Sequence, residues 1–324
     1  MLNNFLQIVP DVIFDAAETL GGRCTGRFLT LNALENRVYD TEMEEGPHLV
    51  IKFYRPGRWS RATIQAEHDF LKALGDSEIP VVCPLADRTG QSIFEITGVM
   101  FAIFPKRPGR LEPELSEEQL TRLGRFLARL HNVGAAAKAA PRLRLDPQTY
   151  GREPLDFLKN RHSVPMELAS RFETIASQIC AAITPRFDGV KYILLHGDCH
   201  SGNILWNRDD PYFIDFDDML YAPPVQDIWM LTGGDDDYGK ERRRILLEAY
   251  EQIRTFDPTT LQLIEPLRAL RMIHFSAWIA RRWEDCAFKM AFPDFGTEHY
   301  WQEQIEALAL QWEKVQYFTT DLYS

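Results

Sequence analysis

The polar side chains best suited to chemistry lie in one short stretch, H-G-D-C-H-S-G-N at residues 196–203. In it Asp198 precedes Asn203 by five residues, and Asp215 follows Asn203 by twelve. A carboxylate and an amide at this spacing suit a loop that bends around a metal ion, because both supply the oxygen ligands that Mg²⁺ prefers. We therefore expect Asp198 to face an acceptor hydroxyl while the carbonyl of Asn203 turns back to the metal.

Phosphoryl transfer needs a group that positions the acceptor, oxygen ligands for Mg²⁺, a cation for the phosphates and a cover that excludes water. The sequence offers a candidate for each of these. The spacing of Asp198 and Asn203 matches the protein-kinase catalytic loop H-R-D-L-x-x-x-N. Asp215 stands in I-D-F-D-D, where the kinase motif has D-F-G, and Asp217 takes the place of the glycine. The flexible glycine of that motif is therefore absent.

The N-terminal third of the chain favours an antiparallel sheet, because β-branched and aromatic runs alternate there with turn residues. Two hairpins are predicted, with strands at residues 37–43, 48–54, 92–96 and 99–104. A single helix is predicted between the hairpins, from about residue 61 to 74. Since side chains alternate along a strand, Lys52 should point to the face opposite that of Ile51 and Phe53.

Helical periodicity prevails after residue 106. Ser116 and Gln119 form a capping box ahead of leucines spaced by three and four residues, which predicts a half-buried helix. A second helix is predicted over residues 168–183 by the same spacing.

An island of short strands at residues 192–195, 203–206 and 212–216 interrupts the helices, and Asp215 is expected at the end of the last strand. The sequence thus predicts an α+β protein with a bilobal, protein-kinase-like fold. Its smaller N-terminal lobe would be an antiparallel sheet with one helix at residues 1–105, and its larger, mainly helical lobe would occupy residues 106–324.

H-G-D-C-H-S-G-N-I-L-W followed by F-I-D-F-D-D resembles the aminoglycoside phosphotransferase and choline kinase superfamily, which shares the two-lobed protein-kinase fold. L-N-A-L-E-N-R-V-Y, V-I-K-F-Y-R-P-G-R-W and A-P-P-V-Q-D-I-W-M-L are similar to the bacterial stress response kinase A (YihE/RdoA-like) family within it. The resemblance covers about residues 20–300. It implies ATP- and Mg²⁺-dependent transfer of the γ-phosphate to Ser or Thr hydroxyls of proteins, in a bacterial stress response.

The resemblance also implies residue roles. Asp198 would be the catalytic base, Asn203 and Asp215 the Mg²⁺ ligands, and Asp215 thereby part of the catalytic machinery. Lys52 would contact the phosphates, and Glu67 on the following helix would be its ion-pair partner.

The nucleotide-covering turn would run from Asn32 through Ala33 to Arg37. Because this turn has no glycine, side chains as well as backbone must hold it in place. Ala33 stands where related kinases tend to carry a small polar residue.

Phe104, Pro105 and Lys106 would belong to the hinge that lies against adenine, together with Arg107. Pro105 has no N–H to donate, so hydrogen bonds to adenine would come from its neighbours.

Other polar residues have structural interpretations as well as functional ones. Asp217 and Asp218 suit either a pair that supports the metal site or a plain acidic turn. Asp227 in Q-D-I-W is expected to anchor the catalytic loop through backbone amides, and His131 to be structural.

Three alternatives remain open at this point. His196, Asp198 and His200 form an H-x-D-x-H set that could bind a divalent metal in a hydrolase. A non-catalytic binding module with a kinase fold is the second, although Lys52, Asp198, Asn203 and Asp215 are all present. The third is a kinase for a small-molecule hydroxyl, of the aminoglycoside, choline or homoserine type.

Composition limits the partners. The 324 residues include 47 acidic and 36 Lys or Arg side chains, a net charge of −11 that disfavours binding to a nucleic-acid backbone. Five cysteines without a C-x-x-C pair suit a reducing compartment. Neither a signal peptide nor an apolar run of about 20 residues is recognised, so no membrane partner is expected. We expect a cytoplasmic monomer.

Overall fold

The computed structural model describes residues 4–208, 210–234 and 236–317. The chain divides into two units, each assembled from segments that are distant in sequence. The first unit consists of Met1–Arg142, Asp198–Met219 and Lys240–Arg254, and the second of Leu143–Gly197, Leu220–Gly239 and Thr255–Ser324. The lobe boundary predicted after residue 105 lies inside the first unit, and it stays a prediction.

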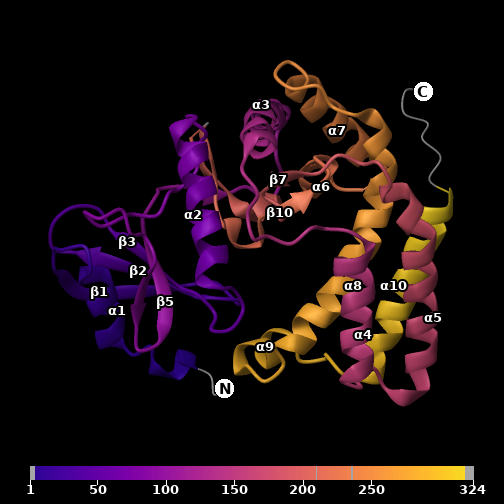
Figure 1. Cartoon of the computed structure of the whole chain (residues 1–324), viewed down its shortest axis with the longest axis horizontal. Coiled ribbons are helices and arrows are strands. Elements are labelled where there is room, and N and C mark those ends of the chain that lie inside the picture. Colours follow the sequence, from indigo (N-terminus) through magenta and orange to yellow (C-terminus); the bar gives the residue numbers. More distant parts are fainter. Residues whose placement is uncertain (1–3, 209, 235, 318–324) are drawn as a thin grey trace. The chain divides into compact units, whose positions relative to one another are not determined.

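Five antiparallel strands form the main sheet of the first unit, in the order β1-β2-β3-β5-β4 (Figure 1). Their bounds are Cys24–Leu31 for β1, Arg37–Met43 for β2, Leu49–Phe53 for β3, Phe94–Ile96 for β4 and Val99–Pro105 for β5. Both predicted hairpins are confirmed. In the second hairpin Thr97 and Gly98 both have positive φ, as a two-residue type I′ turn requires.

The two faces of this sheet are covered by different helices (Figure 1). Ile51 and Phe53 are buried in a core with the apolar side of α1 (Pro10–Glu18). On the opposite face, Ala102 of β5 packs with residues from α2 (Arg61–Asp76) and is the register partner of Lys52. The predicted orientation of Lys52, opposite to its two apolar neighbours, is therefore confirmed.

The first unit continues with a small sheet and two further helices. Ser116 caps α3 with the predicted capping box, in which both reciprocal hydrogen bonds are present. The elements are β6 (Arg110–Leu111), α3 (Glu117–Ala136), β8 (Ile204–Asn207), β9 (Asp210–Phe213) and α7 (Asp237–Tyr250), most of which belongs to this unit. His131 of α3 is buried and bonded to Tyr250 of α7, so its structural role is confirmed.

The prediction of a strand at residues 212–216 is wrong at its C-terminal end. β9 ends at Phe213, because the neighbouring strand β8 starts at Ile204 and offers no register partner beyond it. The N–H of Ile214 still reaches the carbonyl of Asn203, at 3.0 Å. Asp215 then turns out of the sheet with a φ of 60°, so it follows the strand rather than ending it.

The second unit is built mainly of helices. Four of them, α4, α5, α8 and α10, pack side by side (Figure 1). The bounds are Glu153–Asn160 for α4, Met166–Ile183 for α5, Val225–Thr232 for α6, Ile264–Arg281 for α8, Cys286–Ala291 for α9 and Glu298–Tyr317 for α10, with β7 (Ile193–Leu195) paired to β10 (Leu220–Ala222). The helix predicted over residues 168–183 is confirmed as α5. Among the described residues, no helix has the length and apolar character needed to cross a membrane.

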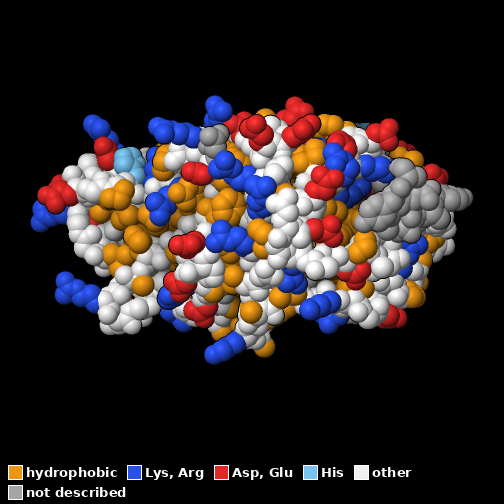
Figure 2. Space-filling view, turned by 90° about the horizontal axis from the view of Figure 1, so that it is seen from above, with side chains coloured by type: hydrophobic (Ala, Val, Ile, Leu, Met, Phe, Trp, Pro, Cys, Tyr) orange, Lys and Arg blue, Asp and Glu red, His pale blue; other side chains and the backbone are white. Residues whose placement is uncertain are grey.

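Charged side chains of both signs are intermixed on the face of the molecule drawn in Figure 2, and they do not gather into one large basic or acidic patch there. The five cysteines are all free thiols. The mixture of signs on this face suits a net charge that serves solubility.

Gly124 provides a test of the packing between α3 and α7. A Cβ atom at this position would lie 2.3 Å from the carbonyl oxygen of Leu246 and 3.0 Å from the Cβ of Ala249. We expect Gly124→Ala to lower the free energy of unfolding by about 1–3 kcal/mol through overpacking, although alanine is the better helix former. Urea unfolding measures this difference, and a stabilised variant would show that the two helices are not packed this closely.

Candidate active site

Strand β3 places the ammonium group of Lys52 among three carboxylates. Its Nζ lies 3.1 Å from Asp217 Oδ1 and 3.4 Å from both Glu67 Oε1 and Asp215 Oδ1. The residue is only 8% exposed. Burial alone would lower the pKa of Lys52, but the charges of Asp217, Glu67 and Asp215 raise it well above its ordinary value. Lys52 is therefore a permanently charged group held inside the protein.

Helix α2 brings Glu67 to this lysine. Ser60 caps the N-terminus of this helix, because its side chain accepts a hydrogen bond from the Thr63 N–H in the first turn. Glu67 is almost completely buried, and its Oε2 lies 3.5 Å from Arg142 Nη2. Burial raises the pKa of Glu67 to about 7, against the opposing charge of Lys52. Glu67 thus pairs with two cations, and the predicted Lys52–Glu67 pair is present.

The position of α2 on the sheet is fixed by the neighbouring His68. Its Nε2 lies 2.9 Å from the Tyr54 hydroxyl and its Nδ1 lies 2.7 Å from Ser92 Oγ. Burial, with the nearby charges of Lys52 and Arg142, lowers the pKa of His68 to about 3. The imidazole is therefore neutral in the folded protein near pH 7.

The loop from Asp198 to Asn203 folds back on itself. Asn203 Nδ2 donates to the carbonyl of Asp198 at 2.9 Å and lies 3.5 Å from its carboxylate. His200 Nε2 lies 3.4 Å from the same carboxylate. The amide nitrogen of Asn203 is thus turned toward Asp198, and its amide oxygen remains for a metal.

The residues directly before Asp198 are held by α6. Asp227 accepts hydrogen bonds from the backbone N–H groups of His196, at 3.1 Å, and Gly197, at 2.8 Å. Gln226 donates to the carbonyl of Gly197 at 2.9 Å. The anchoring role predicted for Asp227 is confirmed. The role of Gln226 was not predicted, because an uncharged side chain beside a motif carries no distinctive signal.

Asp215 combines a left-handed backbone with an accessible carboxylate, since 55% of its side chain is exposed. A non-glycine residue with this φ is uncommon and is found often at functional sites. The Asp215 carboxylate and the Asn203 amide supply hard oxygen donors, which fit Mg²⁺. In the described parts of the chain, no three His, Cys, Asp or Glu side chains are grouped to hold a metal.

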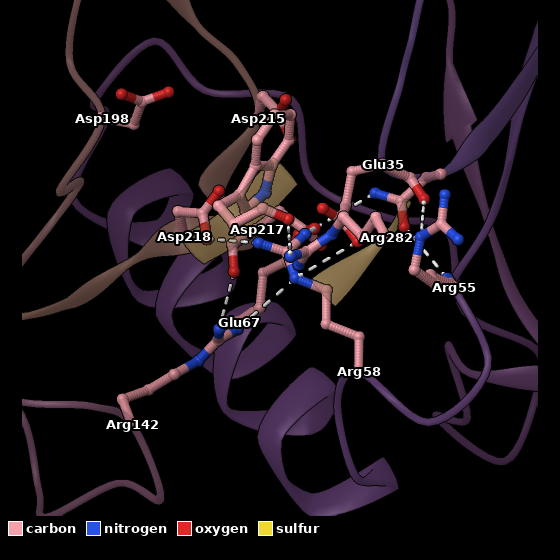
Figure 3. A network of polar contacts seen from close by, with 12 residues as sticks. Glu35, Arg55, Arg58, Glu67, Arg142, Asp198, Asp215, Asp217, Asp218 and Arg282 are labelled. Carbon is pink, nitrogen blue, oxygen red and sulfur yellow. Dashed lines mark hydrogen bonds and ion pairs between the residues drawn. The ribbon is translucent and has the colours of Figure 1, made fainter. Parts of the chain in front are cut away.

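The acidic turn after Asp215 belongs to an ion-pair network in which Asp217 is buried and the side chain of Asp218 is 45% exposed (Figure 3). Asp217 accepts from Asn36 Nδ2 at 3.1 Å and from Arg58, and Arg58 also bonds Asp218. Burial alone would raise the pKa of Asp217, but the charges of Lys52 and Arg58 hold it well below its usual range. Burial likewise opposes the charge of Arg58, yet Asp218 and Asp217 raise the pKa of that guanidinium. Figure 3 also shows Asp198 standing apart from this network.

The predicted nucleotide-covering turn is held by side chains, as its lack of glycine required. Arg55 donates to the carbonyls of Glu35, at 2.9 Å, and Leu34, at 3.2 Å, and its own N–H is bonded to Asn36 Oδ1 at 3.1 Å. Arg37 donates to the carbonyl of Asn36 at 3.2 Å. Within the turn, Asn32 is exposed and Ala33 is half-buried.

The predicted hinge is only partly available for adenine. The N–H of Lys106 donates to the carbonyl of His48 at 3.0 Å, and its ammonium group pairs with Asp40 at 2.6 Å. Phe104 lies on the same strand face as Ala102 and meets the His68 ring edge-on. Since Pro105 lacks an N–H and the N–H of Lys106 is engaged, a backbone N–H for adenine would come from Arg107.

The structure brings Lys52, Glu67 and Asp215 together, and it brings Asp198 next to Asn203. It also assigns four side chains that the sequence did not single out for this site: Asn36, Arg55, Arg58 and Arg142. The R-P-G-R-W segment was a usable signal, because it carries two of these arginines beside Lys52.

Comparison with known proteins gives the class. Residues 29–264 match the Phosphotransferase enzyme family. The chain belongs to this family, and it is a phosphotransferase of the kinase type.

Two bacterial kinases are similar to this chain over most of its length. The chain is 38% identical over 301 residues to the stress response kinase A of Escherichia coli (strain K12), covering 93% of this chain and 91% of that protein. It is also 38% identical over 302 residues, with the same coverage, to the serine/threonine protein kinase RdoA of Salmonella typhimurium. The predicted family is therefore confirmed.

Solved structures confirm the α+β fold class. An amicoumacin kinase in complex with AMP-PNP, Ca²⁺ and Ami superimposes with a TM-score of 0.72 at 19% identity, covering 92% of this chain and 93% of that one. At this level of identity the likeness concerns the fold.

The neutral state of His68 leads to a pH prediction. In the unfolded chain this imidazole takes up a proton below pH about 6.5, whereas the folded protein resists protonation down to about pH 3. Its contribution to stability is therefore present above pH 6.5 and is lost as the pH falls toward 3. We expect the stability advantage of the wild type over His68→Gln to shrink by up to about 1.4 kcal/mol per pH unit below 6.5. Urea unfolding of both proteins between pH 7 and 4.5 measures it, and a constant difference would contradict a neutral buried imidazole.

Proposed function

We propose that this protein transfers the γ-phosphate of ATP, with Mg²⁺ as cofactor, to Ser or Thr hydroxyls of proteins in a bacterial stress response. The observation that carries the proposal is one unit that holds both the buried Lys52–Glu67 pair and the Asp198–Asn203 loop, with Asp215 within reach of Lys52. The names of the relatives at 38% identity support the choice of acceptor and of biological setting.

In this proposal the nucleotide is held by two groups of side chains. Lys52 neutralises the phosphates, while Glu67 keeps its ammonium group in place from the side of α2. Asn203 and Asp215 hold Mg²⁺, which supplies charge neutralisation between the β- and γ-phosphates when it is bound. The turn with Asn32, Ala33 and Arg37 covers the phosphates, and its attachment to Arg55 makes that cover stiff.

Phe104 and Lys106 take the adenine side of the site in this proposal. The ring of Phe104 offers an apolar contact on the same sheet face as Lys52. Lys106 contributes its aliphatic stem, because its charged end is already paired with Asp40.

Asp198 acts as the base. Its carboxylate accepts the proton of the acceptor hydroxyl while the hydroxyl oxygen forms a bond to the γ-phosphorus and the bond to the oxygen of the departing ADP breaks. Asn203 and His200 hold the carboxylate from one side, so its orientation is set before substrate arrives. Asp227 contributes indirectly by fixing the backbone that leads into Asp198.

A small-molecule hydroxyl is the second candidate acceptor. The solved neighbour in complex with AMP-PNP, Ca²⁺ and Ami is an amicoumacin kinase, so this fold also serves a kinase that is named for another acceptor. Aminoglycoside, choline and homoserine hydroxyls belong to the same alternative.

The setting of the enzyme is also part of the proposal. We propose a cytoplasmic monomer that binds neither nucleic acid nor membrane. The net charge of −11 disfavours a nucleic-acid partner, and five free cysteines suit a reducing compartment.

Protein phosphorylation is the direct test. With ATP and Mg²⁺ the wild type should incorporate phosphate on Ser or Thr, in itself or in a generic protein acceptor. Asp198→Asn keeps the shape of the loop and removes the base, so kcat should fall by roughly 10²–10⁴ while ATP binding is retained. Mass spectrometry of the incubated protein reads the added phosphate. Unlabelled protein together with rapid ATP consumption on choline, homoserine or an aminoglycoside would establish the small-molecule alternative instead.

The metal role of Asp215 has its own test. Asp215→Asn removes one negative charge but keeps a residue type that tolerates the left-handed backbone. Metal affinity should fall, and some activity should return at high Mg²⁺ or with Mn²⁺. Activity titrated against each metal measures this effect. A loss of activity with no change in metal dependence would remove Asp215 from the ligand set.

A further inference from the structure

Asp217 occupies the position of the third residue of D-F-G, yet it is tied to more of the protein than Asp215 is. It is 2% exposed, and its carboxylate contacts Lys52, Arg58 and Asn36. Its backbone carbonyl accepts a hydrogen bond from Arg142 at 2.8 Å. In D-F-G the third residue is glycine, which makes the turn flexible. Here Asp217 takes that place and connects the turn to four other residues of the chain.

Arg58 is the centre of these connections. Its guanidinium reaches Asp217 with one nitrogen and Asp218 with another (Figure 3). Its Cζ atom also lies over the ring of Trp59, 4.9 Å from the ring centre. The planar fork of an arginine suits two carboxylates at once, which a lysine cannot match. Arg58 therefore holds both residues that follow Phe216.

The chain presents Arg58 through a rigid turn. The N–H of Arg58 bonds the carbonyl of Arg55, Pro56 stands between them, and Gly57 has a φ of 79°. Proline followed by a residue with positive φ is the pattern of a type II turn. One end of the turn, Arg55, fixes the nucleotide-covering turn, and the other end, Arg58, fixes the acidic turn.

These contacts bear on Asp215, which sits two residues before Asp217. Asp215 has a left-handed backbone, and its side chain is 55% exposed with its carboxylate 3.4 Å from Lys52 Nζ. Arg58 engages the buried carboxylate of Asp217 and one oxygen of Asp218, whose side chain is 45% exposed. Through these contacts Arg58 holds the backbone that directly follows Asp215.

We propose that Arg58 is a positioning residue that sets the metal ligand Asp215 by clamping Asp217 and Asp218. The proposal rests on the proposed function only in the identity of Asp215 as a ligand. Groups that orient a metal ligand without touching the metal commonly change metal affinity when they are removed.

The test compares how nucleotide binding depends on Mg²⁺ in two variants. Arg58→Met removes the guanidinium, and Arg58→Lys keeps the positive charge. The readout is the rise in melting temperature that AMP-PNP gives as Mg²⁺ is titrated, because this needs no acceptor and no turnover. We expect the Mg²⁺ midpoint to rise by about 10- to 100-fold in Arg58→Met and by less in Arg58→Lys. Steady-state kinetics should show the same shift in the Mg²⁺ dependence of kcat.

A double variant separates positioning from general loss of structure. If both residues act on the same ligand, Arg58→Met combined with Asp215→Asn should shift the midpoint no further than Asp215→Asn alone. Arg244 offers a matched control, since it also pairs with two carboxylates, Glu241 and Glu248, but on an exposed helix face. Arg244→Met should leave the midpoint unchanged.

An unchanged Mg²⁺ midpoint in both Arg58 variants would overturn the proposal, even if they melt at lower temperature. Shifts that multiply in the double variant would overturn it as well. If Arg58→Met does not fold, the Mg²⁺ midpoint of Arg58→Lys alone tests the proposal. Failure of the wild type to phosphorylate protein would count against the proposed acceptor and leave this inference standing, whereas no stabilisation by AMP-PNP and Mg²⁺ would overturn both.

Discussion

A buried ammonium group surrounded by carboxylates is the interaction on which the site depends. Taking the charge of Lys52 out of water costs several kcal/mol unless opposite charges and good geometry offset it. Glu67, Asp215 and Asp217 supply that compensation from a helix and from the turn after β9. Because these carboxylates come from α2 and from the acidic turn, the lysine can stay charged only when the sheet, α2 and that turn are all in place.

The negative charges need compensation in turn, and the R-P-G-R-W segment provides it. Arg58 neutralises the acidic turn, and Arg55 holds the loop that is expected to cover the nucleotide. Arg142 completes the set by contacting both Glu67 and the carbonyl of Asp217. Cations and anions therefore alternate through this network, and removal of one member leaves its neighbours with fewer opposite charges.

The groups that handle phosphate and metal do not determine the acceptor. Groups that handle phosphate and metal must meet a fixed geometry, so they recur in kinases with unlike acceptors. The acceptor is recognised by surfaces that the fold does not constrain, and a shared fold therefore does not identify it. In this chain the second unit is mainly helical. The choice of acceptor is therefore guided by the names of the chain's relatives and not by the fold.

Local pattern alone determined much of this protein. Alternation in V-I-K-F-Y predicted that Lys52 points to the strand face opposite that of Ile51 and Phe53. The capping box predicted the start of α3, and the spacing of Asp198, Asn203 and Asp215 predicted the candidate site. The sequence did not predict that β9 stops at Phe213, because strand length depends on the partner that is available. Nor did it predict the contact of Arg58 with Asp217, since ion pairs form between any opposite charges that folding brings together, and these two lie 159 residues apart. Only the tertiary structure decides which distant charges become neighbours, because burial removes the water that would otherwise solvate each of them separately.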